Sequence, residues 1–129
     1  MVYSDLESLQ ASIKTLGIYN DVQVGTLTPP GAAEMPIGYL KSGSFTSAGN
    51  RRFTGILHFV GFHMNADNVE KEMQDAVSDI VPLISNQTDY EPIYITFDDD
   101  VLDFLGMPNF PVLPPEGAFR IDFEMAVYL

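Results

Sequence analysis

Apolar and polar residues alternate near the end of the sequence with the two-residue period of a β-strand. From Phe119 to Leu129 every odd-numbered position is apolar, and the even-numbered positions include Arg120, Asp122 and Glu124. Successive side chains of a strand point to opposite faces, so this pattern predicts one buried face. A long amphipathic strand with an uncovered edge is a template for aggregation. We therefore expect this strand to be paired inside a sheet or covered by another chain.

Two other segments have the apolar spacing of amphipathic helices. The first predicted helix covers residues 4–16, with Ser4 and Glu7 in the S-x-x-E spacing of an N-terminal cap. The second begins at a cap on Asp67, and Pro82 should kink or end it, because proline lacks an N–H and clashes with the preceding turn. The predicted buried stripes are Leu6, Leu9, Ile13 and Leu16 in the first helix and Val69, Met73, Ala76, Val77, Ile80 and Ile84 in the second.

Two extended runs in the middle of the chain predict a central hairpin. Residues 37–46 and 52–63 are separated by "SAGN", which suits a tight turn. The second run is apolar on both faces, as expected of an interior strand. Shorter strands are predicted at residues 22–27 and in "EPIYITF". This order predicts an α+β fold, with a mostly antiparallel or mixed sheet, a central hairpin and two main helices packed on one face.

Length and composition restrict the classes of protein. A chain of 129 residues fits a single domain, residues 1–129. The absence of cysteine excludes disulfides, thiol nucleophiles and cysteine-rich zinc sites. The sequence begins without the basic and apolar regions of a signal peptide, and no window approaches the roughly 18 apolar residues of a membrane span. We expect a soluble protein made in a cytoplasm, with no membrane partner.

The net charge is confined to the second half of the sequence. Residues 1–63 carry four basic and four acidic side chains, which sum to zero, whereas residues 64–129 carry two basic and fourteen acidic ones, which sum to −12. Proteins that grip nucleic acids neutralise phosphates with clustered Lys and Arg, so this balance argues against that class. The simplest interpretation of the acidic excess is a solubilising surface.

The sequence contains few candidates for chemistry. Four acids gather in "FDDDVLD", and oxygen-rich clusters suit Ca²⁺ or Mg²⁺, but their spacing is not that of an EF-hand and a helix cap explains them equally well. His58 and His63 lie five residues apart on one predicted strand, hence on opposite faces, and cannot chelate one metal from that strand. No phosphate-binding loop or serine nucleophile is recognisable. We therefore expect no enzyme activity, no cofactor and no metal.

A proline-rich segment near the end of the chain is unusually apolar for a loop. Its large apolar side chains are Phe104, Leu105, Met107, Phe110, Val112 and Leu113. Loops are usually polar and exposed, so something should cover these groups. Two alternatives remain open: the segment folds back over its own core, or it forms a protein interface.

In size and in the order of its elements, the chain resembles the tail terminator proteins of long-tailed, lambda-like bacteriophages. The resemblance runs through "SDLESLQASIKTLG", "EMPIGYLKSG", "RRFTGILHFVGF", "DNVEKEMQDAVSDIVPLI" and the closing "AFRIDFEMAVYL". The proline-rich stretch 107–116 departs from the family pattern. The resemblance implies a homohexameric ring in the virion, assembled in the host cytoplasm, that ends polymerisation of the tail tube and docks the head-side connector, or stopper, protein.

The ring implied by the resemblance gives the candidate residues roles. DNA would pass through its lumen without specific binding, along an acidic wall of Asp98, Asp99, Asp100 and Asp103. The apolar side chains of residues 104–113 would contact a neighbouring subunit or the tail tube protein. Two other readings stay open: another neck or minor tail component, or a small ligand- or ion-binding module that uses the acidic cluster and the "DYEPIYITF" strand.

Overall fold

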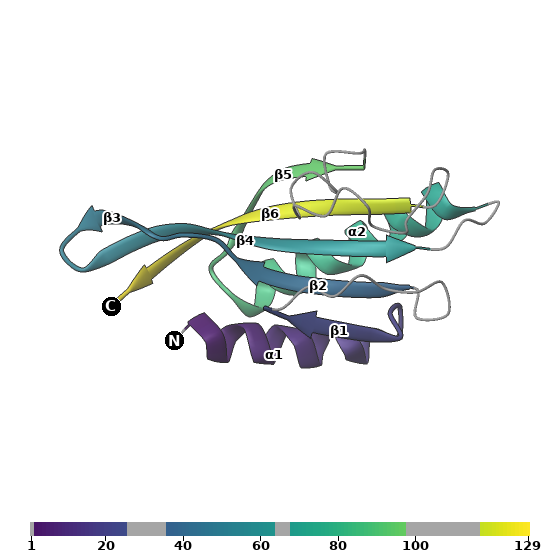
Figure 1. Ribbon diagram of the computed structural model, residues 1–129, viewed down its shortest axis with the longest axis horizontal. Helices are drawn as coiled ribbons and strands as arrows, with labels where there is room; N and C mark the ends of the chain where they lie inside the picture. Colours follow the sequence, from purple (N-terminus) through teal and green to yellow (C-terminus); the bar gives the residue numbers. More distant parts are fainter. Residues whose placement is uncertain (1, 26–35, 64–67, 98–116) are drawn as a thin grey trace.

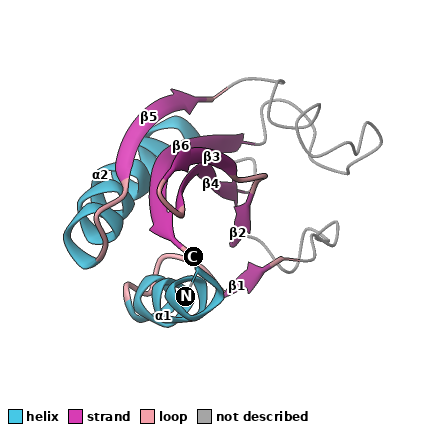
Figure 2. Cartoon of the chain, turned by 90° about the vertical axis from the view of Figure 1, so that its left-hand side faces the viewer, coloured by secondary structure: helices cyan, strands magenta, loops and turns pink. Residues whose placement is uncertain are grey.

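The computed structural model describes residues 2–25, 36–63, 68–97 and 117–129, which form two helices and six strands (Figure 1). The helices are α1 (Val2–Thr15) and α2 (Val69–Gln87), and the strands are β1 (Asp21–Val24), β2 (Ile37–Ser42), β3 (Thr46–Gly49), β4 (Arg52–His63), β5 (Glu91–Thr96) and β6 (Gly117–Tyr128). Both helices lie on the same side of the sheet (Figure 2). The predicted α+β class is confirmed.

The sheet is mixed, and its two longest strands lie at its centre. The strand order is β1-β2-β4-β6-β5, and β3 also pairs with β4. Strands β1 and β2 are parallel, whereas the other pairs are antiparallel. Strand β6 is bonded to β4 on one side, from Arg52↔Tyr128 to His63↔Gly117, and to β5 on the other. The alternating strand at the end of the sequence is therefore paired inside the sheet, which was the first of its two predicted alternatives.

The predicted central hairpin forms, but its first strand is interrupted. Strand β2 ends at Ser42 and β3 begins at Thr46, so residues 37–46 are not one continuous strand. The connection stays close to β4, because the Gly43 N–H donates to the carbonyl of Ile56 (2.8 Å). The turn between β3 and β4 has positive φ at Asn50 and Arg51 (55° and 64°), as a type I′ turn requires.

Three details of the helix ends differ from the prediction. Helix α1 begins at Val2, so Ser4 lies within its first turn and cannot be the N-terminal cap. Helix α2 follows Asn68, whose carbonyl accepts the N–H of Glu72 (2.9 Å) without a side-chain cap, and the predicted cap Asp67 lies outside the described residues.

Pro82 does not end α2, which continues to Gln87. Pro82 and Ser78 are exposed, so water can reach the Ser78 carbonyl that loses its helical partner.

The helices bury their apolar stripes against one face of the sheet. From α1 and α2 the buried side chains are Leu6, Leu9, Ile13, Met73, Ala76, Ile80 and Ile84, and from the sheet Leu40, Leu57, Phe59, Phe119, Ile121, Phe123 and Met125. Leu16, which follows the end of α1, is 40% exposed and leaves the predicted stripe. On the other face of the sheet, Tyr39, Val60 and Phe62 are also buried. Strand β4 is therefore buried on both faces over its second half, as its apolar sequence predicted.

Candidate functional site

The residues that the sequence singled out most strongly lie outside the described part of the chain. This applies to the proposed acidic wall (residues 98–100 and 103) and to the apolar segment 104–113. Their roles stay predictions. The described residues instead present four features with functional potential: an exposed edge strand, a projecting arm, an acidic pocket and a buried polar cluster.

Strand β5, at one edge of the sheet, exposes large apolar side chains. Among the described strands it pairs only with β6. Ile93, Tyr94 and Ile95 of β5 and Phe97, directly after the strand, are 52%, 47%, 41% and 43% exposed. Tyr94 pairs with Asp122 and Ile95 with Ile121, so the exposed groups occupy both faces of the sheet. Contiguous exposed apolar groups on a strand edge are typical of a surface that binds another protein chain. No local sequence signal marks this edge, because the mostly apolar "IYITF" has the pattern expected of a strand buried on both faces.

A three-stranded arm projects from the sheet at the end opposite the start of α2 (Figure 1). We define the arm as β3 with residues 52–54 of β4 and 126–128 of β6, which pair with one another. At its tip the Arg51 Nε donates to a main-chain oxygen of Leu129 (2.7 Å). Arg52 is exposed and pairs across the sheet with Tyr128, which is 74% exposed. The arm tip therefore combines two cations with exposed apolar surface.

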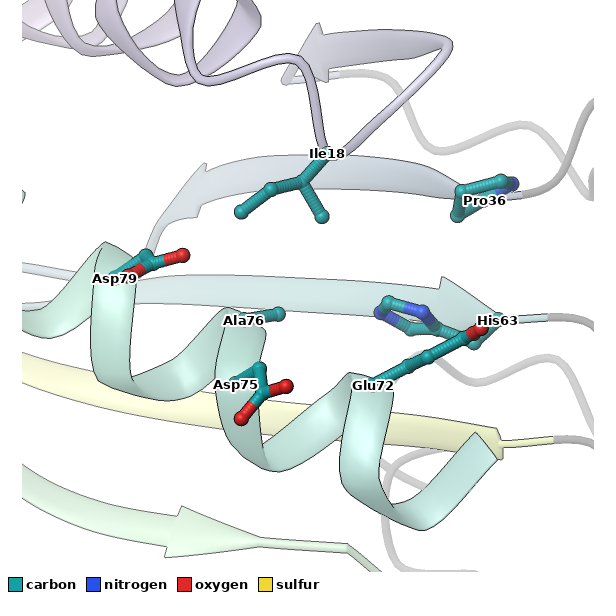
Figure 3. A pocket seen from close by; sticks show the side chains of 7 residues that line it. All are labelled: Ile18, Pro36, His63, Glu72, Asp75, Ala76 and Asp79. Carbon is teal, nitrogen blue, oxygen red and sulfur yellow. The ribbon is translucent and has the colours of Figure 1, made fainter. Parts of the chain in front are cut away.

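A pocket of about 360 Å³ lies between helix α2 and the ends of β2 and β4 (Figure 3). Its lining residues are Ile18, Pro36, His63, Glu72, Asp75, Ala76 and Asp79. The three acids recur at helical spacing on α2 and so share one side of the helix. Lys71 pairs with Asp75 (2.6 Å), an exposed i,i+4 pair. The carboxylates of Glu72, Asp75 and Asp79 outnumber the ammonium group of Lys71, so the rim of the pocket has a net negative charge.

His63 forms a neutral polar pair with Tyr19 at this pocket. The His63 side chain points into the pocket (Figure 3), and its Nε2 lies 3.1 Å from the Tyr19 hydroxyl. The imidazole also lies edge-on to the Tyr19 ring and near Phe119. Burial lowers the pKa of His63 to about 4 and raises the pKa of Tyr19 well above its usual value. Both groups are therefore uncharged at neutral pH.

The buried imidazole makes folding stability depend on pH. Protons bind His63 with a pKa of about 4 in the folded chain and about 6.5 in the unfolded chain, so acid favours unfolding between these values. Between pH 7 and pH 4.5 we expect wild type to lose about 2 kcal/mol more unfolding free energy than His63→Gln, which has no such proton. Urea unfolding of both proteins at the two pH values measures this. Parallel losses would contradict the assignment.

A buried polar cluster lies on the sheet face away from the helices. His58 Nδ1 is 2.7 Å from Asp122 Oδ1, and the two side chains are 11% and 10% exposed. Arg120 Nε lies 3.1 Å from the same oxygen, close enough for an ion pair but not aligned as a hydrogen bond. The Arg120 guanidinium also stands over the Tyr94 ring, 5.4 Å from its centre. The cluster thus joins β4, β6 and β5.

The environment of His58 indicates a structural role for this cluster. Burial lowers the pKa of His58, and the neighbouring carboxylate of Asp122 opposes that shift. A neutral imidazole whose Nδ1–H donates to Asp122 satisfies both groups and ties the register of β4 to β6. Sequence reasoning missed Asp122, because its position in the alternating strand predicted an exposed side chain, whereas it is 7% exposed.

The two histidines lie on opposite faces of β4, as predicted. His63 contacts Tyr19 on the helix-covered face, whereas His58 contacts Asp122 on the other. The described ranges contain no group of three or more His, Asp or Glu side chains that could hold a metal ion. The structure therefore offers these histidines separate environments and no shared chelate.

No protein-family model matches the chain, and no curated protein matches it. Within the described residues, no helix is long and apolar enough to cross a membrane.

Proposed function

We propose that the chain is a structural virion protein that caps a phage tail tube as a homohexameric ring, in the manner of a tail terminator. The observation that carries this proposal is the exposed apolar edge of β5, with Ile93, Tyr94, Ile95 and Phe97. In a single copy, between 41% and 52% of each of these residues is exposed to water. A second copy can cover them, and contacts between unlike surfaces can close into a ring with no free interface. Another neck or minor tail component would use the same surface.

The charge distribution supports the same function. The chain has a net charge of −12. A surface with such an acidic excess repels phosphates, which suits a ring through which DNA passes without binding. The proposed partners are further copies of this chain, the tail tube protein and the head-side connector. The ring would assemble in the host cytoplasm and remain in the virion.

The proposed ring has a direct test in its mass and shape. Six copies of 14.3 kDa give about 86 kDa, which light scattering after size exclusion separates clearly from the monomer. Negative-stain images should show rings with a central hole. A protein that stays monomeric and neither forms rings nor caps purified tail tubes would contradict the proposal.

The β5 edge should be needed for association. Replacing Ile93 and Ile95 with serine removes exposed apolar surface, and we expect the dissociation constant between subunits to rise about tenfold or more. Both side chains are half exposed, so the melting temperature of the isolated subunit should change little. Leu16→Ser is a matched control, because Leu16 is 40% exposed but lies away from this edge. Equal association of wild type, variant and control would count against the β5 edge.

A second candidate function is a small ligand-binding module. The acidic pocket, with a volume of about 360 Å³ and His63 at its wall, favours this alternative. The two functions differ in simple measurements. A binding module stays monomeric and gains melting temperature with a small cationic ligand, because a ligand that binds only the folded state stabilises it.

A further inference from the structure

The arm tip and the acidic pocket are complementary surfaces at opposite ends of one molecule. The arm tip carries Arg51 and Arg52 beside the exposed ring of Tyr128. The pocket carries Glu72 and Asp79 around the apolar Ile18 and Ala76. Each surface therefore joins charged groups of one sign to apolar contact area. Complementary charge of this kind favours association and sets its orientation.

The arm tip cannot reach the pocket of its own chain. Arg52 is the first residue of β4 and His63, which lines the pocket, is the last. A strand of 12 residues at about 3.3 Å per residue is about 40 Å long. Figure 1 shows the arm and the start of α2 at opposite ends of the long axis. Any contact between the two surfaces must therefore join different copies.

The pocket also has a buried polar group at its wall. His63 is 2% exposed, its side chain points into the pocket (Figure 3), and its Nε2 lies 3.1 Å from the Tyr19 hydroxyl. Asp75 is already paired with Lys71, so Glu72 and Asp79 are the acids best placed to receive a cation. An arginine side chain, with its five N–H donors, can bind both carboxylates.

We propose that the arm tip of one copy docks into the acidic pocket of the next, with Arg52 as the main contact to Glu72 and Asp79. This inference rests on the proposed ring and names one of its contacts. The interface is heterologous, because one end of a molecule binds the opposite end of another. Repeated around a closed ring, the contact uses every arm and every pocket.

Charge reversal tests the contact. Arg52→Glu and Glu72→Arg should each weaken association by tenfold or more in light scattering at low salt, because each places like charges together. The melting temperature of the subunit should not change, since both side chains are exposed. Lys14→Glu and Glu7→Arg are matched controls with the same charge changes on exposed positions of α1, and they should associate like wild type.

Mixing the two single variants gives the sharpest result. The Arg52→Glu protein has an acidic arm tip, which fits the basic pocket of the Glu72→Arg protein. The Glu72→Arg protein keeps its native basic tip, which fits the native acidic pocket of the Arg52→Glu protein. Equal amounts should therefore assemble together, in alternation, although each fails alone. The double variant Arg52→Glu/Glu72→Arg should also assemble.

The outcomes separate this contact from the proposed function. A wild-type ring that both single variants leave intact, or a mixture that does not recover, would overturn the arm contact and leave the ring standing. A monomeric wild type in the presence of tail tubes would overturn both. Binding of a small cation to the monomer that Glu72→Arg abolishes, without any association, would assign the pocket to a ligand instead of to the arm.

Discussion

Replacing Asp122 with alanine is expected to reduce the free energy of unfolding by about 3–5 kcal/mol. The Asp122 carboxylate lies between His58 and Arg120, and all three side chains are largely buried. Asp122→Ala removes the ion pair of the Arg120 guanidinium with Asp122 and the hydrogen-bond acceptor of the His58 imidazole. The free-energy cost of burying these two polar groups is then less fully compensated. Urea or guanidinium unfolding measures the loss.

A neighbouring acid on the same strand provides the control. Glu124 lies two residues along β6 and is exposed, so Glu124→Ala should change the unfolding free energy by only about 0.5 kcal/mol. Asp122→Asn keeps an acceptor near His58 but removes the charge, and it should fall between wild type and Asp122→Ala. If Asp122→Ala and Glu124→Ala cost the same, the cluster does not hold the centre of the sheet.

Replacing Phe59 with alanine should be comparably severe, with a loss of about 3–5 kcal/mol. Phe59 is fully buried at the centre of β4, with ring centres 5.7 Å from Tyr19 and 6.0 Å from Phe119. Its ring also packs on Gly38, so closely that a Cβ at position 38 would lie 2.9 Å from the ring. Because glycine has no side chain, Gly38 cannot fill the cavity that Phe59→Ala would leave.

The matched control for Phe59 lies on the same strand. Phe53 is half-buried and belongs to the arm, so Phe53→Ala should cost clearly less. The comparison uses the same side-chain truncation and differs only in burial. A loss at Phe53 equal to that at Phe59 would mean that the arm is as tightly packed as the centre of the sheet.

The fold could be predicted from the sequence wherever one local pattern determined one element. The stripe from Met73 to Ile84 and the alternation of residues 119–125 correctly predict buried apolar side chains. The alternation fails at Leu129, which is 46% exposed, and at Asp122, which is buried. The helix ends were less predictable, because a serine with the right spacing can cap a helix or lie inside its first turn. Helix α2 continues past Pro82 because water can reach the carbonyl of Ser78, and the spacing of apolar residues does not predict that exposure.

The surfaces with functional potential could not be predicted in the same way. The His58–Asp122 pair depends on the register of two strands that are far apart in sequence, and no local pattern encodes that register. The exposure of Ile93 depends on β5 being the edge strand. The place of the acidic pocket, at the end of β4 far from the arm, depends on how α2 packs on the sheet, and no local pattern encodes that packing. The predicted roles of residues 98–113 remain predictions.

The position of β6 has a consequence for synthesis. Strand β4 bonds along its full length to β6, yet Gly117 follows His63 by 54 positions, with α2 and β5 between them. While the ribosome is still making that intervening stretch, the inner edge of β4 has no partner from β6 and its apolar side chains stay accessible. Such open edges invite wrong pairing between nascent chains. The subunit therefore completes its sheet only after β6 has been synthesised and has paired with both β4 and β5.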